Sequence, residues 1–152
     1  FLEEVFLWLS ENLPSNPNPK KLCWGDSRLG NVLFENFRVK SLLDWEMATI
    51  GDPLCDLAWG LTTDDVSSYG LNIEKLPGSI ANEEAIKFWE KNTGFSADNF
   101  FYYRILCLFK FSVIMIRVAK KLIHNEIMPL DSDFHVNNHV SNYLRQEFNE
   151  KN

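Results

Sequence analysis

Three polar side chains in the first third of this 152-residue chain have the types and spacing needed for phosphoryl transfer. Asp26 and Asn31 are five residues apart, and Asp44 follows 13 residues later, at the end of a hydrophobic run. A carboxylate can accept or orient the proton of an attacking hydroxyl, and an amide oxygen can hold Mg²⁺ against phosphate groups. A second carboxylate adds another of the hard oxygen ligands that Mg²⁺ prefers. The three residues together predict a phosphoryl-transfer site, although none of them is informative alone.

Short β-like runs must position these side chains. Residues 31–34 and 39–43 are rich in Val, Leu and Phe, and the polar residues between them suit a turn, so we predict a β-hairpin. Asn31 then begins the hairpin and Asp44 ends it. Gly51–Pro53 reads as a turn, with Pro53 well placed to start a helix.

The remainder of the chain has helical patterns. We expect an amphipathic helix over residues 1–13 and further helices over 54–62, 82–92, about 98–125 and 133–147. Residues 64–79 are polar and contain two glycines and a proline, so they predict a loop. Asn82 is expected to cap the third of these helices and Gly94 to end it.

Three segments resemble the aminoglycoside phosphotransferase / choline kinase family. They are Trp24–Phe34 (WGDSRLGNVLF), Leu42–Ala48 (LLDWEMA) and Gly51–Trp59 (GDPLCDLAW). Within that family, the opening Trp-Gly-Asp-Ser-Arg is most similar to the branch related to the kinase-like domain of some acyl-CoA dehydrogenases. The resemblance implies an α+β, mostly helical fold: a protein-kinase-like C-terminal lobe with a small β-hairpin carrying the catalytic loop.

The resemblance also implies roles for individual residues. Asp26 would be the catalytic base, or would orient the acceptor hydroxyl, and Asn31 and Asp44 would bind Mg²⁺ and, through it, ATP. Asp56 would brace the catalytic loop by accepting its backbone N–H groups. Most members have His where this chain has Trp24, which changes the packing under the loop and leaves the catalytic role of Asp26 open.

Arg28 is a further candidate catalytic residue, inferred from its place two residues after Asp26. It could face the transferring phosphate or an anionic acceptor. An equally reasonable alternative is a surface arginine paired with a neighbouring acid. Glu46 and Asp52 lie in the same motifs, and we expect structural roles for them rather than metal binding.

No Gly-rich loop and no lysine-bearing strand of the Val-Ala-Ile-Lys kind precedes Asp26. We therefore expect residues 1–152 to be the C-terminal, catalytic lobe of a kinase-like phosphotransferase whose N-terminal nucleotide-binding lobe is absent from this chain. Such a lobe by itself should bind MgATP weakly and turn over little.

The composition of the chain argues against two kinds of partner, nucleic acid and a membrane. A net charge of -6 argues against a nucleic-acid binder, and charged residues interrupt the apolar segment 100–123 too often for a membrane span. Three widely spaced cysteines in apolar surroundings favour buried, reduced thiols in a cytoplasmic protein.

The expected reaction moves the γ-phosphate of ATP to a hydroxyl of a small molecule, with a hydroxyacyl-CoA as one candidate acceptor. The acids at positions 64, 65, 83 and 84 could form an acidic acceptor surface or simply a solvated face. Two other functions remain open: a catalytically silent pseudokinase or binding module, and an esterase with Ser27 as nucleophile. The esterase needs a C-terminal Asp-x-x-His, and this chain has none.

Overall fold

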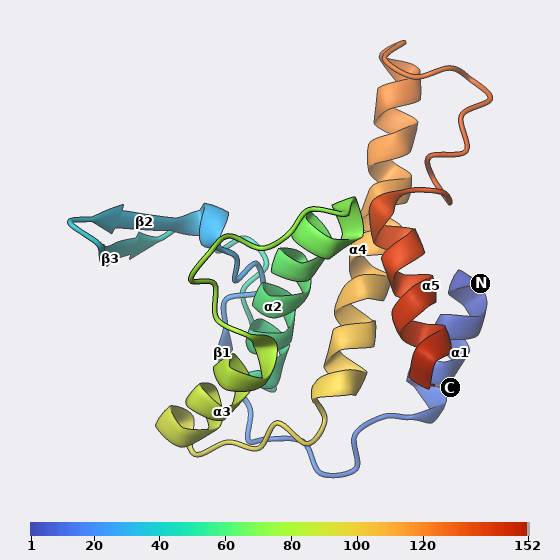
Figure 1. The fold of residues 1–152 in the computed structure, drawn as a ribbon. Helices are drawn as coiled ribbons and strands as arrows, with labels where there is room; N and C mark the ends of the chain where they lie inside the picture. The colour runs from blue at the N-terminus through green and yellow to red at the C-terminus, as the bar shows by residue number, and fades with distance from the viewer. Residues whose placement is uncertain (152) are drawn as a thin grey trace.

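The structure is a computed structural model that describes residues 1–151, in which helices pack side by side and a narrow hairpin stands away from them (Figure 1). In chain order the elements are α1 (Leu2–Glu11), β1 (Lys21–Cys23), η1 (Leu29–Asn31), β2 (Val32–Glu35), β3 (Arg38–Leu42), β4 (Thr49–Gly51), α2 (Leu54–Ser68), η2 (Tyr69–Leu71), α3 (Asn82–Thr93), α4 (Phe100–His124) and α5 (His139–Lys151). The expected α+β, mostly helical fold class is confirmed.

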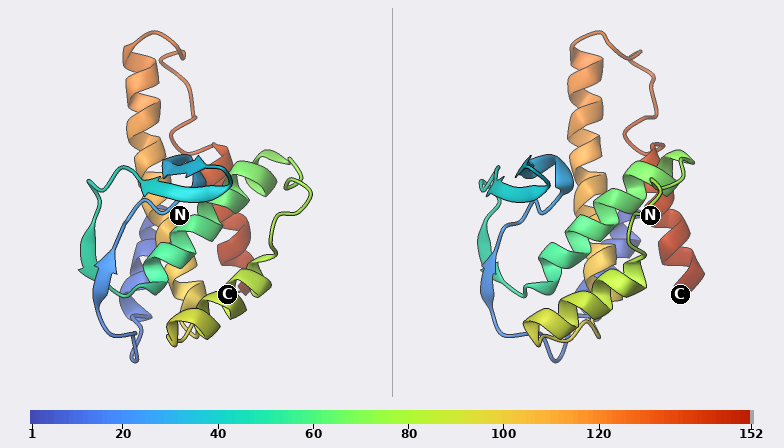
Figure 2. Two further views of the ribbon diagram at one scale, coloured as in Figure 1. Left: turned by 90° about the vertical axis from the view of Figure 1, so that its left-hand side faces the viewer. Right: turned by 60° about the vertical axis from the view of Figure 1, so that its left-hand side comes forward.

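The predicted hairpin is confirmed as the antiparallel pair β2–β3, in which Val32 is opposite Leu42. A two-residue turn joins the strands, with positive φ at both Asn36 and Phe37. This backbone matches the twist of a hairpin, although Phe is an unusual residue for it. Figure 2 shows that the hairpin projects from the helical body, and every residue of β3 is exposed.

Residues 21–24, whose sequence allows a short strand, do contain one, β1, but the two-stranded sheet to which it belongs was not predicted. β1 pairs antiparallel with β4, with Leu22 opposite Ile50. Each strand has three residues, which is too short for an alternating pattern to emerge. The pair fixes where the chain enters and leaves the segment that contains the hairpin.

The helix expected to end at Thr62 continues to Ser68, so the predicted loop begins later than we expected. The reason is that Asp65, one of the polar residues that suggested a loop, is buried and paired. Its carboxylate contacts Lys75 Nζ at 2.6 Å and Arg104 Nη1 at 2.7 Å. Asp65 is therefore not part of an acidic acceptor surface.

Two helix starts also differ from the prediction. Asn82 does not cap α3; its amide instead donates to Asp65 Oδ2 at 2.7 Å. The last helix begins at His139 rather than near 133, because Asn138 Oδ1 accepts the backbone N–H groups of Val140 and Ser141. Gly94 ends α3 in the left-handed conformation, as predicted.

The core lies where α4 passes between the other helices. One buried cluster joins α1, α4 and α5 through residues such as Val5, Leu108 and Leu144. A second joins α2 and the first half of α4 through Leu54 and Cys107. Towards its C-terminus α4 extends beyond its neighbours, and residues 125–138 return along it to α5 (Figures 1 and 2).

Cys23 and Cys107 are buried, as expected, whereas Cys55 is half-buried; all three are free thiols. Burial raises the pKa of Cys55 and of Cys107 to about 12. No helix within residues 1–151 is long and apolar enough to cross a membrane.

A buried ionic network holds the helices together. Arg104 on α4 bonds Asp65 on α2 and, through Nε at 2.7 Å, Glu147 on α5. Burial alone would raise the pKa of Asp65, but hydrogen bonds from Lys75 and Arg104 outweigh it and lower that pKa. The pairing of Asp65 therefore stabilises the fold above the ordinary aspartate pKa of about 3.9 and is lost as the pH falls below it.

We predict that Asp65→Ala lowers the free energy of unfolding by about 3 kcal/mol at neutral pH, because it removes one of the two acidic partners of the buried Arg104 and of the partly buried Lys75. Urea denaturation measures this. Glu35→Ala is the control: it breaks a surface pair with Lys40 and should cost no more than about 1 kcal/mol. The difference between the variants should shrink as the pH falls below about 4. Equal costs at neutral pH would contradict the prediction.

Candidate active site

The segment of residues 24–31, here called the Asp26 loop, is fastened to the start of α2. The Asp56 carboxylate accepts the backbone N–H of Trp24 at 2.6 Å and that of Gly25 at 2.8 Å. Ser27 Oγ donates to the backbone oxygen of Asp56 at 2.6 Å. Hydrogen bonds to a charged group are worth about 1.5–3 kcal/mol each, so Asp56 holds the loop backbone firmly.

Two glycines allow the Asp26 loop to lie close to its neighbours, Gly25 toward Met47 and Gly60 toward α2. Gly25 has a φ of 89°, and a Cβ there would lie 2.3 Å from the backbone oxygen of Met47. On α2, a Cβ at Gly60 would lie 2.7 Å from the backbone oxygen of Ser27. Sequence reasoning missed Gly60, which looks like an ordinary helix residue until the loop is placed over it.

Three side chains hold the Asp26 carboxylate. Trp59 Nε1 on α2 donates to Oδ1 at 2.7 Å, and Asn31 Nδ2 donates to Oδ2 at 2.6 Å. Arg28 Nε lies 3.1 Å from the same Oδ2. The structure thus brings together the predicted residues Asp26, Arg28 and Asn31, and adds Trp59. That tryptophan ends the third motif, but nothing in the sequence placed it beside Asp26.

These contacts keep Asp26 ionised. Partial burial acts to raise its pKa, but the hydrogen bonds from Trp59, Arg28 and Asn31, with the charge of Arg28, outweigh burial and lower that pKa below its ordinary value. At neutral pH the group is a carboxylate that accepts hydrogen bonds.

Asn31 ends η1, just before β2, and Asp44 lies two residues after the end of β3. The backbone N–H of Leu43 donates to the backbone oxygen of Asn31 at 2.8 Å, so Asp44 is one residue beyond the partner of Asn31. Asp44 is exposed and has a φ of 59°, a left-handed conformation that Asp tolerates better than most residues. The Asn31 side chain donates through Nδ2 to the backbone oxygen and to Oδ2 of Asp26.

Trp24 connects the loop to the segment that carries Asp44. Its indole N–H donates to the backbone oxygen of Leu43 at 2.7 Å, and its ring lies 5.9 Å from that of Trp45. Trp24 therefore supports the residue just before Asp44, at the position where most members of the resembled family have His.

The alternative prediction for Arg28 was a surface arginine paired with a neighbouring acid. In the structure Arg28 is paired, and the acid is Asp26. Half of its side chain is exposed. A role for Arg28 toward a phosphate stays a prediction.

Asp52, expected to be structural, accepts the N–H of Leu54 and of Asn18, both at 2.9 Å, and the hydroxyl of Tyr103 at 3.1 Å. It therefore fixes the start of α2. Since α2 carries both Asp56 and Trp59, Asp52 supports the site indirectly.

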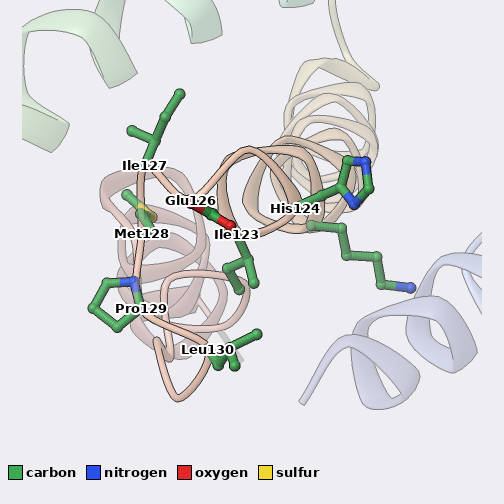
Figure 3. A pocket seen from close by; sticks show the side chains of 8 residues that line it. Ile123, His124, Glu126, Ile127, Met128, Pro129 and Leu130 are labelled. Carbon is green, nitrogen blue, oxygen red and sulfur yellow. The ribbon is translucent and has the colours of Figure 1, made fainter.

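A pocket of about 390 Å³ opens beside the Asp26 loop. Its apolar lining comes from the loop, the start of β2, α2 and the segment before α3: Trp24, Leu29, Val32, Leu57, Leu61 and Ile80. Its acids already have partners, because Asp56 holds the loop and Asp64 pairs with Lys75 at 2.7 Å. A separate pocket at the far end of α4 is lined by His124, Met128 and Leu130, and neither Asp26 nor the residues that bond it line this pocket (Figure 3).

The fold is one seen among solved structures. A Ralstonia eutropha protein assigned to the aminoglycoside phosphotransferases superposes with a TM-score of 0.70 and 20% identity, over 96% of this chain and 46% of that one. This likeness defines the class: a kinase-like phosphotransferase fold.

Sequence comparison gives the family. The family model described as the phosphotransferase enzyme family matches residues 1–89. This chain therefore belongs to the phosphotransferase enzyme family, and the resemblance found from the motifs is confirmed.

Acyl-CoA dehydrogenase family member 11 of Pongo abelii is 34% identical over 124 residues, which are 74% of this chain and 16% of that protein. The Gallus gallus protein of the same name is 33% identical over 138 residues, or 82% of this chain and 18% of that protein. The chain thus spans less than a fifth of the length of these relatives.

We predict that Gly60→Ala destabilises the protein by about 1 kcal/mol or more, although Gly→Ala within a helix ordinarily stabilises by up to about 1 kcal/mol. The added methyl group would press on the Ser27 backbone oxygen. Gly70→Ala is the matched control, since its new Cβ would lie no closer than 3.6 Å to another residue. Urea denaturation of both variants tests the packing of the loop on α2, and equal stabilities would contradict it.

Proposed function

We propose that this chain is the catalytic lobe of a Mg-dependent phosphotransferase that moves the γ-phosphate of ATP to a hydroxyl of a small molecule. The observation that carries the proposal is the Asp26 carboxylate, oriented by Asn31, Arg28 and Trp59 on a loop fastened to α2. The hydroxyl of the small molecule can donate a hydrogen bond to such a carboxylate, which turns the hydroxyl oxygen toward a phosphate.

In this mechanism Asp26 orients the acceptor hydroxyl and receives its proton as the new O–P bond forms and the bond to ADP breaks. A carboxylate with a lowered pKa is a weak base, which suits a reaction in which the proton leaves late and positioning contributes most. Arg28, beside Asp26 and half exposed, is suited to contact the negative charge of the transferring group.

The donor set around Asp26 fits Mg²⁺. Asn31 offers its Oδ1, because its Nδ2 is committed to Asp26. Asp44 offers an exposed carboxylate one residue beyond Leu43, whose backbone N–H donates to the backbone oxygen of Asn31. Both are hard oxygen ligands. The bound metal would neutralise phosphate charge, and the protein would hold it through these two side chains.

The chain would supply one side of the site. The nucleotide-gripping part that kinases carry on an N-terminal lobe has no counterpart in the sequence motifs, so we propose that residues 1–152 form the C-terminal lobe. The exposed apolar side chains of the β2–β3 hairpin, such as Phe34 and Val39, fit a face that another part of the protein covers.

The pocket beside the Asp26 loop is proposed to hold the chain of the acceptor: Asp26 itself does not line it, but Arg28, which bonds Asp26, does. Its lining is mainly apolar and its acids are paired, so it suits a hydrocarbon chain better than a polycationic aminoglycoside. The likeness to acyl-CoA dehydrogenase family member 11 makes a hydroxyacyl-CoA a reasonable candidate.

We predict that Asp26→Asn in the full-length protein lowers the rate of Mg-dependent ADP release at least about 100-fold, because it removes the proton acceptor but keeps the shape of the side chain. Asp131→Asn, at an exposed acid in the segment between α4 and α5, is the control and should leave the rate unchanged. Chelation of Mg²⁺ should abolish release. Full activity in Asp26→Asn would contradict the assignment, and a wild-type protein that binds MgATP without turnover would favour the pseudokinase.

We predict that Ile80→Trp selectively weakens the use of long acceptors, because the larger ring fills the pocket. The measurement compares KM for the 4-carbon and 12-carbon 3-hydroxyacyl-CoA esters, and we expect a rise of about tenfold for the longer one only. Ile73→Trp, at a similarly exposed position outside the pocket, is the control. Equal effects on both esters would place the acceptor elsewhere.

A further inference from the structure

We propose that Trp59 is a positioning residue that directs the acceptor hydroxyl to one particular oxygen of Asp26, namely Oδ1. The inference rests on the proposed phosphotransferase function and adds to it a role for a residue that ends the third motif but had no role assigned there. It follows from which hydrogen-bonding positions of the carboxylate are already taken.

Each oxygen of a carboxylate has two lone pairs and can accept two hydrogen bonds. Oδ2 accepts from Asn31 at 2.6 Å and from Arg28 at 3.1 Å, so both of its positions are used. Oδ1 accepts from Trp59 at 2.7 Å and keeps one position. That remaining position is where an acceptor hydroxyl would donate.

The three donors differ in where they come from. Arg28 and Asn31 lie on the same loop as Asp26 and move with it, whereas Trp59 belongs to α2. Of the three donors, the indole is therefore the one that bonds the carboxylate directly from a helix, whereas Arg28 and Asn31 act through the loop that Asp56 fastens to α2. Without it, only the two hydrogen bonds on Oδ2 would orient the carboxylate, and no donor would hold Oδ1 in its direction.

Trp59 is itself firmly held. It is only 5% exposed, its ring lies 6.0 Å from that of Phe111, and Lys110 Nζ lies 5.0 Å above it. Both neighbours belong to α4, which packs along α2 (Figure 1). The indole thus connects Asp26 to the buried cluster between α2 and α4.

An indole suits this task chemically. Its N–H is a donor that carries no charge and does not accept a proton under ordinary conditions, so it orients the carboxylate without competing for the proton of the acceptor. A lysine or arginine at this place would pair with Asp26 more strongly and would weaken it further as a base.

The test is Trp59→Phe in the full-length protein, which keeps an aromatic ring and removes the donor. With MgATP and water as acceptor, we expect kcat for ADP release to fall about tenfold or more while KM for MgATP stays unchanged. Trp89→Phe is the matched control, because that ring packs on Phe95 and its indole contacts no part of Asp26. A residue that served only stability would change the melting temperature and leave kcat of the folded protein intact.

Replacing Trp59 by benzothienylalanine, which has the shape of Trp with sulfur in place of the N–H, separates the donor from packing. It should lower kcat as Phe does at an unchanged melting temperature. A kcat equal to that of wild type would overturn the inference while Asp26→Asn remained inactive, so the proposed function would stand. If the wild type shows no turnover, crystal structures decide: a rotated Asp26 carboxylate in Trp59→Phe supports the inference, and an unmoved one overturns it.

Discussion

The two hydrogen bonds from the backbone of Trp24 and Gly25 to the Asp56 carboxylate determine where the rest of the site lies. They attach the Asp26 loop to the first turn of α2, and the absence of a side chain at Gly60 lets the loop lie directly on that helix. Once the loop is there, Asp26 is within reach of Trp59, one turn further along α2. The precision of the site therefore comes from α2 and from the α4 core behind it.

The local part of the site could be predicted from the sequence. Asp26 and Asn31 are five residues apart, so one tight loop brings them together, and the hairpin that leads to Asp44 has a plain strand–turn–strand pattern. The fold class was implied by the family resemblance that these motifs carry, and the helical periodicity agreed with it. These features depend on interactions between residues close in the chain.

The long-range contacts could not be predicted. Trp59 meets Asp26 across 33 residues, and Arg104 meets Asp65 across 39. The second pairing also explains the misjudged end of α2: Asp65 looks like a loop residue in the sequence, but its charge is compensated by Arg104 and Lys75 in the interior. A single sequence carries no signal for such partners until the helices are placed.

The central claim is that Asn31 and Asp44 hold one metal–phosphate site beside Asp26, and Mn²⁺ binding measures it most directly. Electron paramagnetic resonance of the full-length protein with Mn²⁺ and a non-hydrolysable ATP analogue gives the affinity for the bound metal–nucleotide. We expect Asn31→Ala and Asp44→Ala each to weaken this affinity about tenfold or more. In the double variant, the loss of binding free energy should be smaller than the sum of the losses in the two single variants. Unchanged affinity in both single variants would contradict the account.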